Sequence, residues 1–184
     1  MMRAAALIAA VIASCGGGAS TPQVSLQGSV GGDPASAKGG RAYLTLQANH
    51  SQVAGLLVIT VSSNALVCGG AAPDCDTQAL LLVLGDVSGG KLGAATGAGD
   101  YAVGDAAQTS PPDGATALAV YASSKQLGGQ CRTKGGLGAS GVVHLKTFNV
   151  AKGQTVAGTF LVTLASGETL TGSFSLPLCD PQAS

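Results

Sequence analysis

The sequence predicts an all-β protein, an antiparallel β-sandwich or a partly closed β-barrel of about eight to ten strands. Over several segments apolar and polar residues alternate with a period of two, the spacing of a half-buried strand rather than of a helix. Short stretches rich in turn-forming residues separate these segments, and glycine alone supplies 29 of the 184 residues. With no Trp and three Phe, we expect a core built mainly of Val and Leu.

Five segments in the first two thirds of the chain are candidate strands. Residues 41–47 and 117–123 alternate between apolar and polar side chains. Residues 53–61 and 78–84 are continuous apolar runs between turn signals, typical of strands covered on both faces. The second run also fits a short buried helix, and residues 101–103 are a shorter strand candidate.

The C-terminal part predicts an antiparallel meander of three strands, at residues 141–150, 155–164 and 169–176. Short Gly-containing turns connect them, which favours neighbouring antiparallel strands. Because proline lacks a backbone N–H, we expect Pro177 to end the last strand. Alternation predicts two inward-facing sets of side chains, Val156, Phe160, Val162 and Leu164 on one strand and Leu170, Phe174 and Leu176 on the next.

The N-terminal residues have the three parts of a secretory signal: Arg3, an apolar run from Ala4 to Ala13, and small residues before Cys15. A membrane-spanning helix needs roughly 20 apolar residues, so this run is too short. Ile12-Ala13-Ser14-Cys15 resembles the lipobox of bacterial lipoproteins. The resemblance implies lipidation of Cys15, cleavage before it and a membrane partner through the lipid. A secreted protein without lipid is the alternative.

These features divide the chain into a signal peptide (1–14), a lipidated cysteine with a flexible Gly/Ser/Pro tether (15–40) and a β-domain (41–184). As a random coil, the tether would reach about 25–30 Å. Residues 24–28 within it could still form a first strand. Gly16, which follows the cysteine, resembles the outer-membrane sorting signal of diderm bacteria and implies that location.

The charge of the chain gives no support for a nucleic-acid partner. Lys and Arg number 9 and Asp and Glu number 9, so removing Arg3 with the signal leaves 8 − 9 = −1. Charged residues are 10% of the chain, against roughly 25% in typical domains. Apolar residues are 46%, which argues against a disordered chain.

Four cysteines remain beside Cys15, and an even number in an exported protein predicts two disulfides. We expect Cys68–Cys75, because the segment between them is rich in turn formers, and therefore Cys131–Cys179. A metal site is the rival interpretation. It is disfavoured because the sequence has no Cys-x-x-Cys pair and its two histidines lie at no ligand-like spacing.

The catalytic and cofactor motifs that the sequence contains are incomplete, so we predict no catalytic, cofactor-binding or metal-binding residues. Residues 136–141 fit G-x-G-x-x-G, but a strand follows where a dinucleotide site needs a helix, and we expect a flexible loop. Ser88-Gly-Gly-Lys91 fits S-x-x-K, but its glycines disfavour the required helix and predict a turn.

The histidines and aspartates are better explained as surface residues. His50 lies in a polar loop, and His144 lies in a predicted strand beside Lys146, where a solvated side chain is expected. No Gly-x-Ser-x-Gly elbow accompanies them. The aspartates of the loops form no calcium-binding pattern and are typical turn residues: Asp74, Asp76, Asp86, Asp100, Asp105 and Asp113.

Tyr101, the strand from Ser140 to Leu145, and the segments Gly158-Thr-Phe160 and Gly172-Ser-Phe174 together resemble secreted bacterial lipoprotein β-domains of unknown function. That resemblance implies no activity and no catalytic residue. The sequence thus favours a lipid-anchored cell-envelope protein with a structural or interaction role, and not an enzyme. A β-barrel module that binds a small or apolar ligand is the alternative, and a secreted hydrolase is a third.

Overall fold

The computed structural model describes residues 22–49, 52–66, 68, 75–89, 91–105, 113–149 and 154–179. They form strands and no helix, which confirms the all-β prediction. None of the described residues forms a helix able to cross a membrane. The strands are β1 (Gln23–Gln27), β2 (Ser29–Val30), β3 (Asp33–Pro34), β4 (Gly39–Asn49), β5 (Gln52–Ser62), β6 (Thr77–Ser88), β7 (Lys91–Gly93), β8 (Gly99–Val103), β9 (Gly114–Leu127), β10 (Gln130–Thr147), β11 (Thr155–Leu164) and β12 (Thr169–Cys179).

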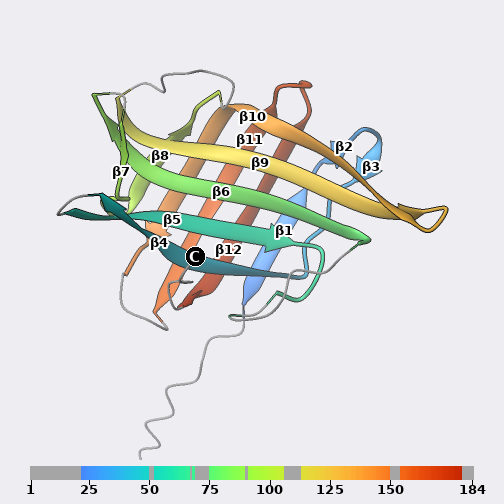
Figure 1. The fold of residues 1–184 in the computed structure, drawn as a ribbon, viewed down its shortest axis with the longest axis horizontal. Coiled ribbons are helices and arrows are strands. Elements are labelled where there is room, and N and C mark those ends of the chain that lie inside the picture. Colours follow the sequence, from blue (N-terminus) through green and yellow to red (C-terminus); the bar gives the residue numbers. More distant parts are fainter. Residues whose placement is uncertain are drawn as a thin grey trace, which may run out of the picture.

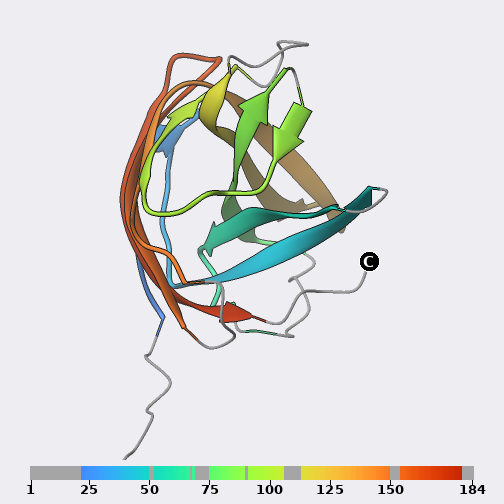
Figure 2. The same cartoon turned by 90° about the vertical axis from the view of Figure 1, so that its left-hand side faces the viewer.

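Ten of these strands form one sheet in the order β1-β12-β11-β10-β8-β9-β6-β5-β4, with β7 paired to β6. The sheet curls into a ring (Figures 1 and 2), because β12 also pairs with β4. Two contacts are parallel, β12 with β4 and β8 with β9, so the sheet is mixed rather than purely antiparallel as predicted. The short β2 and β3 form a separate hairpin.

Strand β10 is shared by the two walls of the ring. Its first half pairs with β9 and its second half with β8, while residues from Gly138 onward also pair with β11. Figure 2 shows the curved wall of β10, β11 and β12 facing the wall that contains β4 and β5. The chain therefore turns a corner within a single strand, and a register shift between Gly138 and Ser140 marks it.

The glycines at this corner were expected to form a flexible loop, and the structure places them inside β10 instead. A Cβ on Gly138 would lie 2.8 Å from the Cβ of Ala119 and 3.0 Å from a methyl of Val103. Gly141 has a φ of +134°, a conformation that favours glycine. The glycines of the G-x-G-x-x-G pattern are therefore explained by the close approach of strands at a bend. Glycine has the same role elsewhere in β-sheets.

The core fills the inside of the ring. The inward-facing sets predicted for the C-terminal meander are confirmed, and matching rows come from the opposite wall. Continuous apolar residues 78–84 form part of β6, not a helix. The largest buried side chains include Leu57, Ile59, Leu80, Leu82, Leu84, Tyr101, Tyr121, Leu145, Leu164, Leu170 and Leu176.

Each of the two Gly-x-Phe segments packs its aromatic ring over the glycine of the other. In the ladder between β11 and β12, Phe160 pairs with Gly172 and Gly158 with Phe174. A Cβ on Gly158 would lie 2.8 Å from the Phe174 ring. Both rings are buried. The motif shared with other β-proteins is therefore a packing device, in which a glycine leaves room for an aromatic ring on the neighbouring strand.

Two boundaries predicted from sequence are wrong. The expected tether (15–40) is part of the β-domain from residue 22 onward, because β1 pairs with β12, and Val30 and Ala35 pack in or against the core. The optional strand at residues 24–28 is confirmed as β1. Pro177 does not end the last strand, since β12 continues to Cys179. Pro177 faces Thr155, the first residue of β11, and beyond it β12 pairs with β4 instead.

Candidate functional site

Residues 28–38, which we call the cap, lie between the β11–β12 turn and β9 at one end of the ring (Figure 1). The cap contains the β2–β3 hairpin and holds its own shape through a hydrogen bond from Ala35 N to Gly28 O (2.9 Å). On one side Gly31 N donates to Glu168 Oε1 (2.7 Å) in the β11–β12 turn. On the other side Lys125 Nζ of β9 donates to Asp33 Oδ1 (2.9 Å). The cap therefore bridges the two walls of the ring.

Gln78, near the start of β6, fixes the second half of the cap. Its Oε1 accepts a hydrogen bond from Ser36 N (2.9 Å), and its Nε2 donates to Pro34 O (3.0 Å). Its backbone N–H donates to Ser63 Oγ (2.8 Å), while Ser63 N donates to Gln78 O (2.9 Å). One glutamine thus joins the cap to the β5–β6 connection.

Both carboxylates that hold the cap have lowered pKa values. The hydrogen bond and charge of Lys125 lower the pKa of Asp33 below 3.8. The Gly31 N–H, followed by the Ser166 hydroxyl, lowers the pKa of Glu168 below 4.5. In both cases the partner favours the charged form, so both contacts are made at neutral pH.

Beside the cap lies a hollow of about 290 Å³, which we call the end hollow. Serine hydroxyls, amides and one cation form most of its lining: Ser36, Ser63, Asp76, Gln78, Ser123, Ser124, Lys125, Gln126 and Leu127. Leu127 is the apolar member, with 55% of its surface exposed. The ammonium of Lys125 is neutralised by Asp33, so the hollow has no strong positive potential.

Tyr121 lies one inward position deeper on β9 than Ser123. It is 1% exposed, and its hydroxyl is buried with the ring. Burial raises the pKa of the phenol, and the carboxylate of Asp33 raises it further. Its interaction with the Ser123 hydroxyl lowers the pKa in part. Tyr121 is therefore part of the core below the end hollow and does not belong to the lining of that hollow.

A second hollow, also of about 290 Å³, lies on the outer face of the same strands, beside the connection from β5 to β6. Hydroxyl groups dominate it, but several are already bonded to protein atoms. Thr77 Oγ1 donates to Cys75 O (3.2 Å) and accepts from Asn64 Nδ2 (2.9 Å). Ser62 Oγ accepts from Asn64 N (3.2 Å). This outer groove therefore serves mainly to hold the connection in place.

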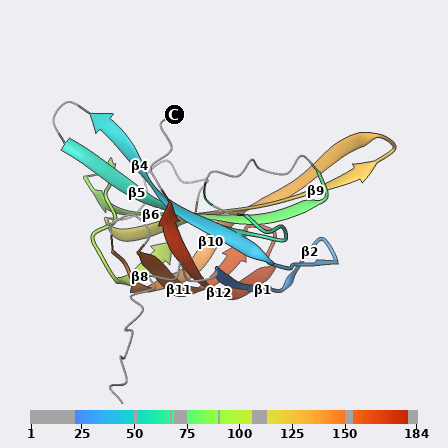
Figure 3. The same cartoon turned by 90° about the horizontal axis from the view of Figure 1, so that it is seen from below.

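The cysteines pair differently from the prediction. Cys68 bonds Cys179, with 5.3 Å between Cα atoms, and Cys75 bonds Cys131, with 5.7 Å. Both separations lie within the usual range for disulfides. We call the first the seam bridge, because Cys179 pairs with Tyr43 where the ring closes. We call the second the arm bridge, because Cys131 lies in the β9–β10 hairpin, which projects from the ring (Figures 1 and 3).

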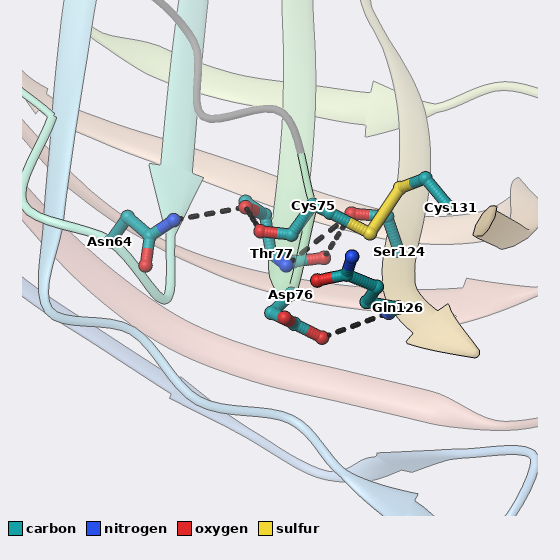
Figure 4. Close-up of a disulfide and its surroundings, with 7 residues drawn as sticks. All are labelled: Asn64, Cys75, Asp76, Thr77, Ser124, Gln126 and Cys131. Atoms are coloured by element: carbon teal, nitrogen blue, oxygen red, sulfur yellow. Dashed lines mark hydrogen bonds between the residues drawn. A yellow bond between two sulfur atoms is a disulfide. The ribbon is translucent and has the colours of Figure 1, made fainter. Parts of the chain in front are cut away.

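The expected Cys68–Cys75 bridge is wrong, because each cysteine lies beside a different strand. Cys68 bonds Cys179 of β12, and Cys75 bonds Cys131 of β10. Cys75 lies just before β6, in the part of the sheet where β9 separates β6 from β10. Figure 4 shows the Cys75 side chain directed to Cys131. Asp76 has a φ of +56°, and its Oδ1 accepts a hydrogen bond from Gln126 N (3.0 Å). Turn-rich composition predicted that Cys68 and Cys75 could approach, but strand pairing decides their partners.

The other residues singled out from sequence form no compact site. His144 lies exposed on β10 and pairs with Asp100 on β8, a cross-strand contact on the outer surface. His50 and Asp74 lie outside the described residues. The expected turn after Ser88 is confirmed, with Gly89 at a φ of +58°. Within the described ranges, no group of three His, Cys, Asp or Glu side chains could hold a metal ion.

Sequence reasoning did not single out Tyr121, Asp33, Lys125 or Gln78. One signal was present in β9, where the inward positions change from apolar residues to Tyr121, Ser123 and then Lys125. Such a change along one face marks the place where a strand leaves the core. The partners on the cap had no sequence signal, because they lie far away in the chain.

Cys15 lies outside the described residues. Comparisons with protein-family models, curated proteins and solved structures gave no match to this chain.

Proposed function

We propose that this protein is a lipid-anchored component of a bacterial cell envelope, held at the membrane through Cys15, with a structural or interaction role. The lipobox-like residues Ile12-Ala13-Ser14-Cys15 and the preceding apolar run support export and lipidation. Gly16 supports sorting to the outer membrane. The domain then works as a rigid body next to the bilayer and not as an enzyme.

The observation that carries this proposal is the pairing of the cysteines. All four cysteines of the β-domain are in the seam bridge and the arm bridge. Disulfides of this kind persist in oxidising compartments such as the periplasm and are rare in the cytosol. Because the chain has five cysteines, Cys15 is the one left for another chemistry. Lipidation gives it a role that fits its position.

The distance between anchor and domain is shorter than the sequence suggested. β1 begins at Gln23, eight residues after Cys15, so the connection spans at most about 26–29 Å when fully extended. As a flexible coil it would span about 14–17 Å, against about 25–30 Å for a tether to residue 40. The domain would therefore lie close to the membrane surface, and its partners would be molecules of that surface.

The test is metabolic labelling with a radiolabelled fatty acid in a bacterial host, followed by membrane fractionation. Wild-type protein should carry the label and fractionate with membranes, and Cys15→Ser should lose both properties. Ser14→Ala, which keeps a small residue before the cysteine, is the matched control and should retain the label. An unlabelled wild-type protein would exclude lipid anchoring.

A second candidate function is the binding of a small molecule, and the end hollow favours it. The inside of the ring is filled by the core, so a ligand held deep within the ring has no support. The end hollow instead offers polar groups at the surface of the domain. A hydrolase has weaker support, because His144 and Asp100 lie on an exposed sheet face.

A further inference from the structure

The outer face of the wall that contains β1, β12 and β11 carries no charged side chain. Alternate residues of these strands point away from the core. The outward positions hold Ser, Thr and Gln residues, and the exceptions are Ala157, Leu161 and Pro177. We call this surface, together with Val142 on the adjoining part of β10, the hydroxyl face. It is flat in chemistry, since neither carboxylates nor cations interrupt it.

An apolar row crosses the hydroxyl face. Val142 of β10 pairs with Leu161 of β11, and Ala102 of β8 pairs with Val142 on its other side. Leu161 is 44% exposed and Val142 is 37% exposed. Figure 2 shows that this wall is convex toward the outside. A flat partner would touch such a wall near its middle, and β11, which carries Leu161, is the middle strand in the order β1-β12-β11-β10-β8.

The polar groups around the apolar row suit a layer of phospholipid headgroups. The hydroxyls of Ser25 and Ser173 bond each other (2.8 Å). Such a pair uses one of its two hydroxyl hydrogens, so the other can donate to a phosphate or ester oxygen. In the next row on β8 and β10, the carboxylate of Asp100 is paired with His144. The face therefore presents hydrogen-bond donors and no unpaired carboxylate that would repel phosphates.

The hydroxyl face also lies within reach of the proposed anchor. Its first strand, β1, begins at Gln23, eight residues after Cys15. Gln23 pairs with Ser175, and Leu161 lies one strand further and two outward positions along the sheet. With strands about 4.8 Å apart and outward positions about 6.7 Å apart, Gln23 and Leu161 are separated by about 16 Å. The extended connection of about 26–29 Å therefore allows the lipid on Cys15 and the side chain of Leu161 to enter the same membrane surface.

We propose that the hydroxyl face lies on the phospholipid bilayer to which Cys15 is attached, with Leu161 and Val142 in the headgroup region. This proposal rests on the proposed lipid anchor and deepens it, because it assigns the face of the domain that is turned to the membrane. Two partly exposed aliphatic side chains form only a weak contact. A short tether raises the effective concentration of the face at the bilayer to the order of millimolar, so that a weak contact is enough to orient the domain.

The test uses the lipidated full-length protein, purified from a bacterial host and reconstituted into vesicles of phosphatidylethanolamine and phosphatidylglycerol. The chain has no Trp, so one introduced Trp is the only indole in the protein. Leu161→Trp should show blue-shifted fluorescence on vesicles and should be quenched when the lipids carry bromine near the top of the acyl chains. Val142→Trp should respond in the same way as an independent reporter.

Leu137→Trp is the matched control. Leu137 is also a strand residue and is 41% exposed, but it pairs with Val120 of β9 on the opposite wall. Its Trp should keep the same fluorescence with brominated and with ordinary lipids. Because all three side chains are exposed, none of these substitutions removes a core residue, and far-ultraviolet circular dichroism should be unchanged.

Vesicle flotation separates this proposal from the lipid anchor itself. Protein that floats with the vesicles while Leu161→Trp is not quenched would overturn the orientation and leave the anchor standing. Quenching of Leu137→Trp as strong as that of Leu161→Trp would also overturn it, because no single face would then be preferred. A blue shift of Leu161→Trp that grows with protein concentration in the absence of lipid would assign the face to a second copy of the chain instead. Wild-type protein that fails to float would overturn both proposals.

Discussion

Phe160 provides the sharpest test of how the core is built, because glycine lies opposite it. The phenyl ring is 4% exposed and packs over Gly172 of the neighbouring strand. Replacing Phe160 with alanine removes a buried aromatic side chain, whose transfer to water costs about 1.5–3 kcal/mol. The residual cavity, on the order of 100 Å³, adds about 2.4 kcal/mol at 24 cal/mol per Å³.

We therefore expect Phe160→Ala to lower the free energy of unfolding by about 4–5 kcal/mol, near the upper end for such changes. The upper end applies because Gly172 has no side chain that could move into the space. For a domain of this size, each kcal/mol corresponds to about 2–4 °C, so the melting temperature should fall by about 8–20 °C.

The assay is thermal and urea unfolding of the oxidised protein followed by far-ultraviolet circular dichroism. Thr159→Ala is the matched control, since Thr159 is the adjacent residue, faces outward and pairs with Ser173. It should cost less than about 1 kcal/mol. A loss below about 1.5 kcal/mol for Phe160→Ala, or a larger loss for Thr159→Ala, would refute the packing argument.

Three further predictions concern the bridges, the cap and the corner. A non-reducing digest analysed by mass spectrometry should contain the peptides of the seam bridge and the arm bridge, and a peptide linking Cys68 to Cys75 would contradict the structure. The Gly31 amide resonance should titrate with an apparent pKa below 4.5, since Glu168 accepts its N–H. The contact is present at neutral pH and is lost as the pH falls through the lowered pKa of Glu168. A Gly31 resonance that does not titrate would argue against it. Gly138→Ala should destabilise the protein by about 1–3 kcal/mol in urea unfolding, because its Cβ would meet the Cβ of Ala119 at 2.8 Å; an unchanged midpoint would show that the corner can relax.

Local patterns were sufficient to predict the strands but not the way the ring is completed. Alternation located β11 over residues 155–164 and the inward direction of Phe160 and Phe174, because the period of two is a property of neighbouring residues. Continuous apolar runs located β5 and β6. The glycines at residues 136–141 were wrongly assigned to a loop, because glycine is common both in loops and at tight bends within strands.

The cap and the disulfides could not be predicted, because long-range contacts determine both. Residues 28–38 have a composition typical of a linker, and their order comes from Glu168 and Lys125, which are 137 and 92 residues away from their partners. The pairing of Cys68 with Cys179 depends on β12 meeting β4. No spacing within the sequence contains that information.

The pairing of the first strand with the last has a consequence for the order of folding during export. Gln23 of β1 lies opposite Ser175 of β12, 175 − 23 = 152 residues later. β1 therefore has no partner until nearly the whole chain has emerged, and contacts of such high sequence separation form slowly. A protein anchored at its N-terminus would stay tethered and incomplete at the membrane until its C-terminal strand arrived. A chain truncated before Thr169 should accordingly remain protease-sensitive, whereas early protease resistance would show that the ring assembles without its closing strand.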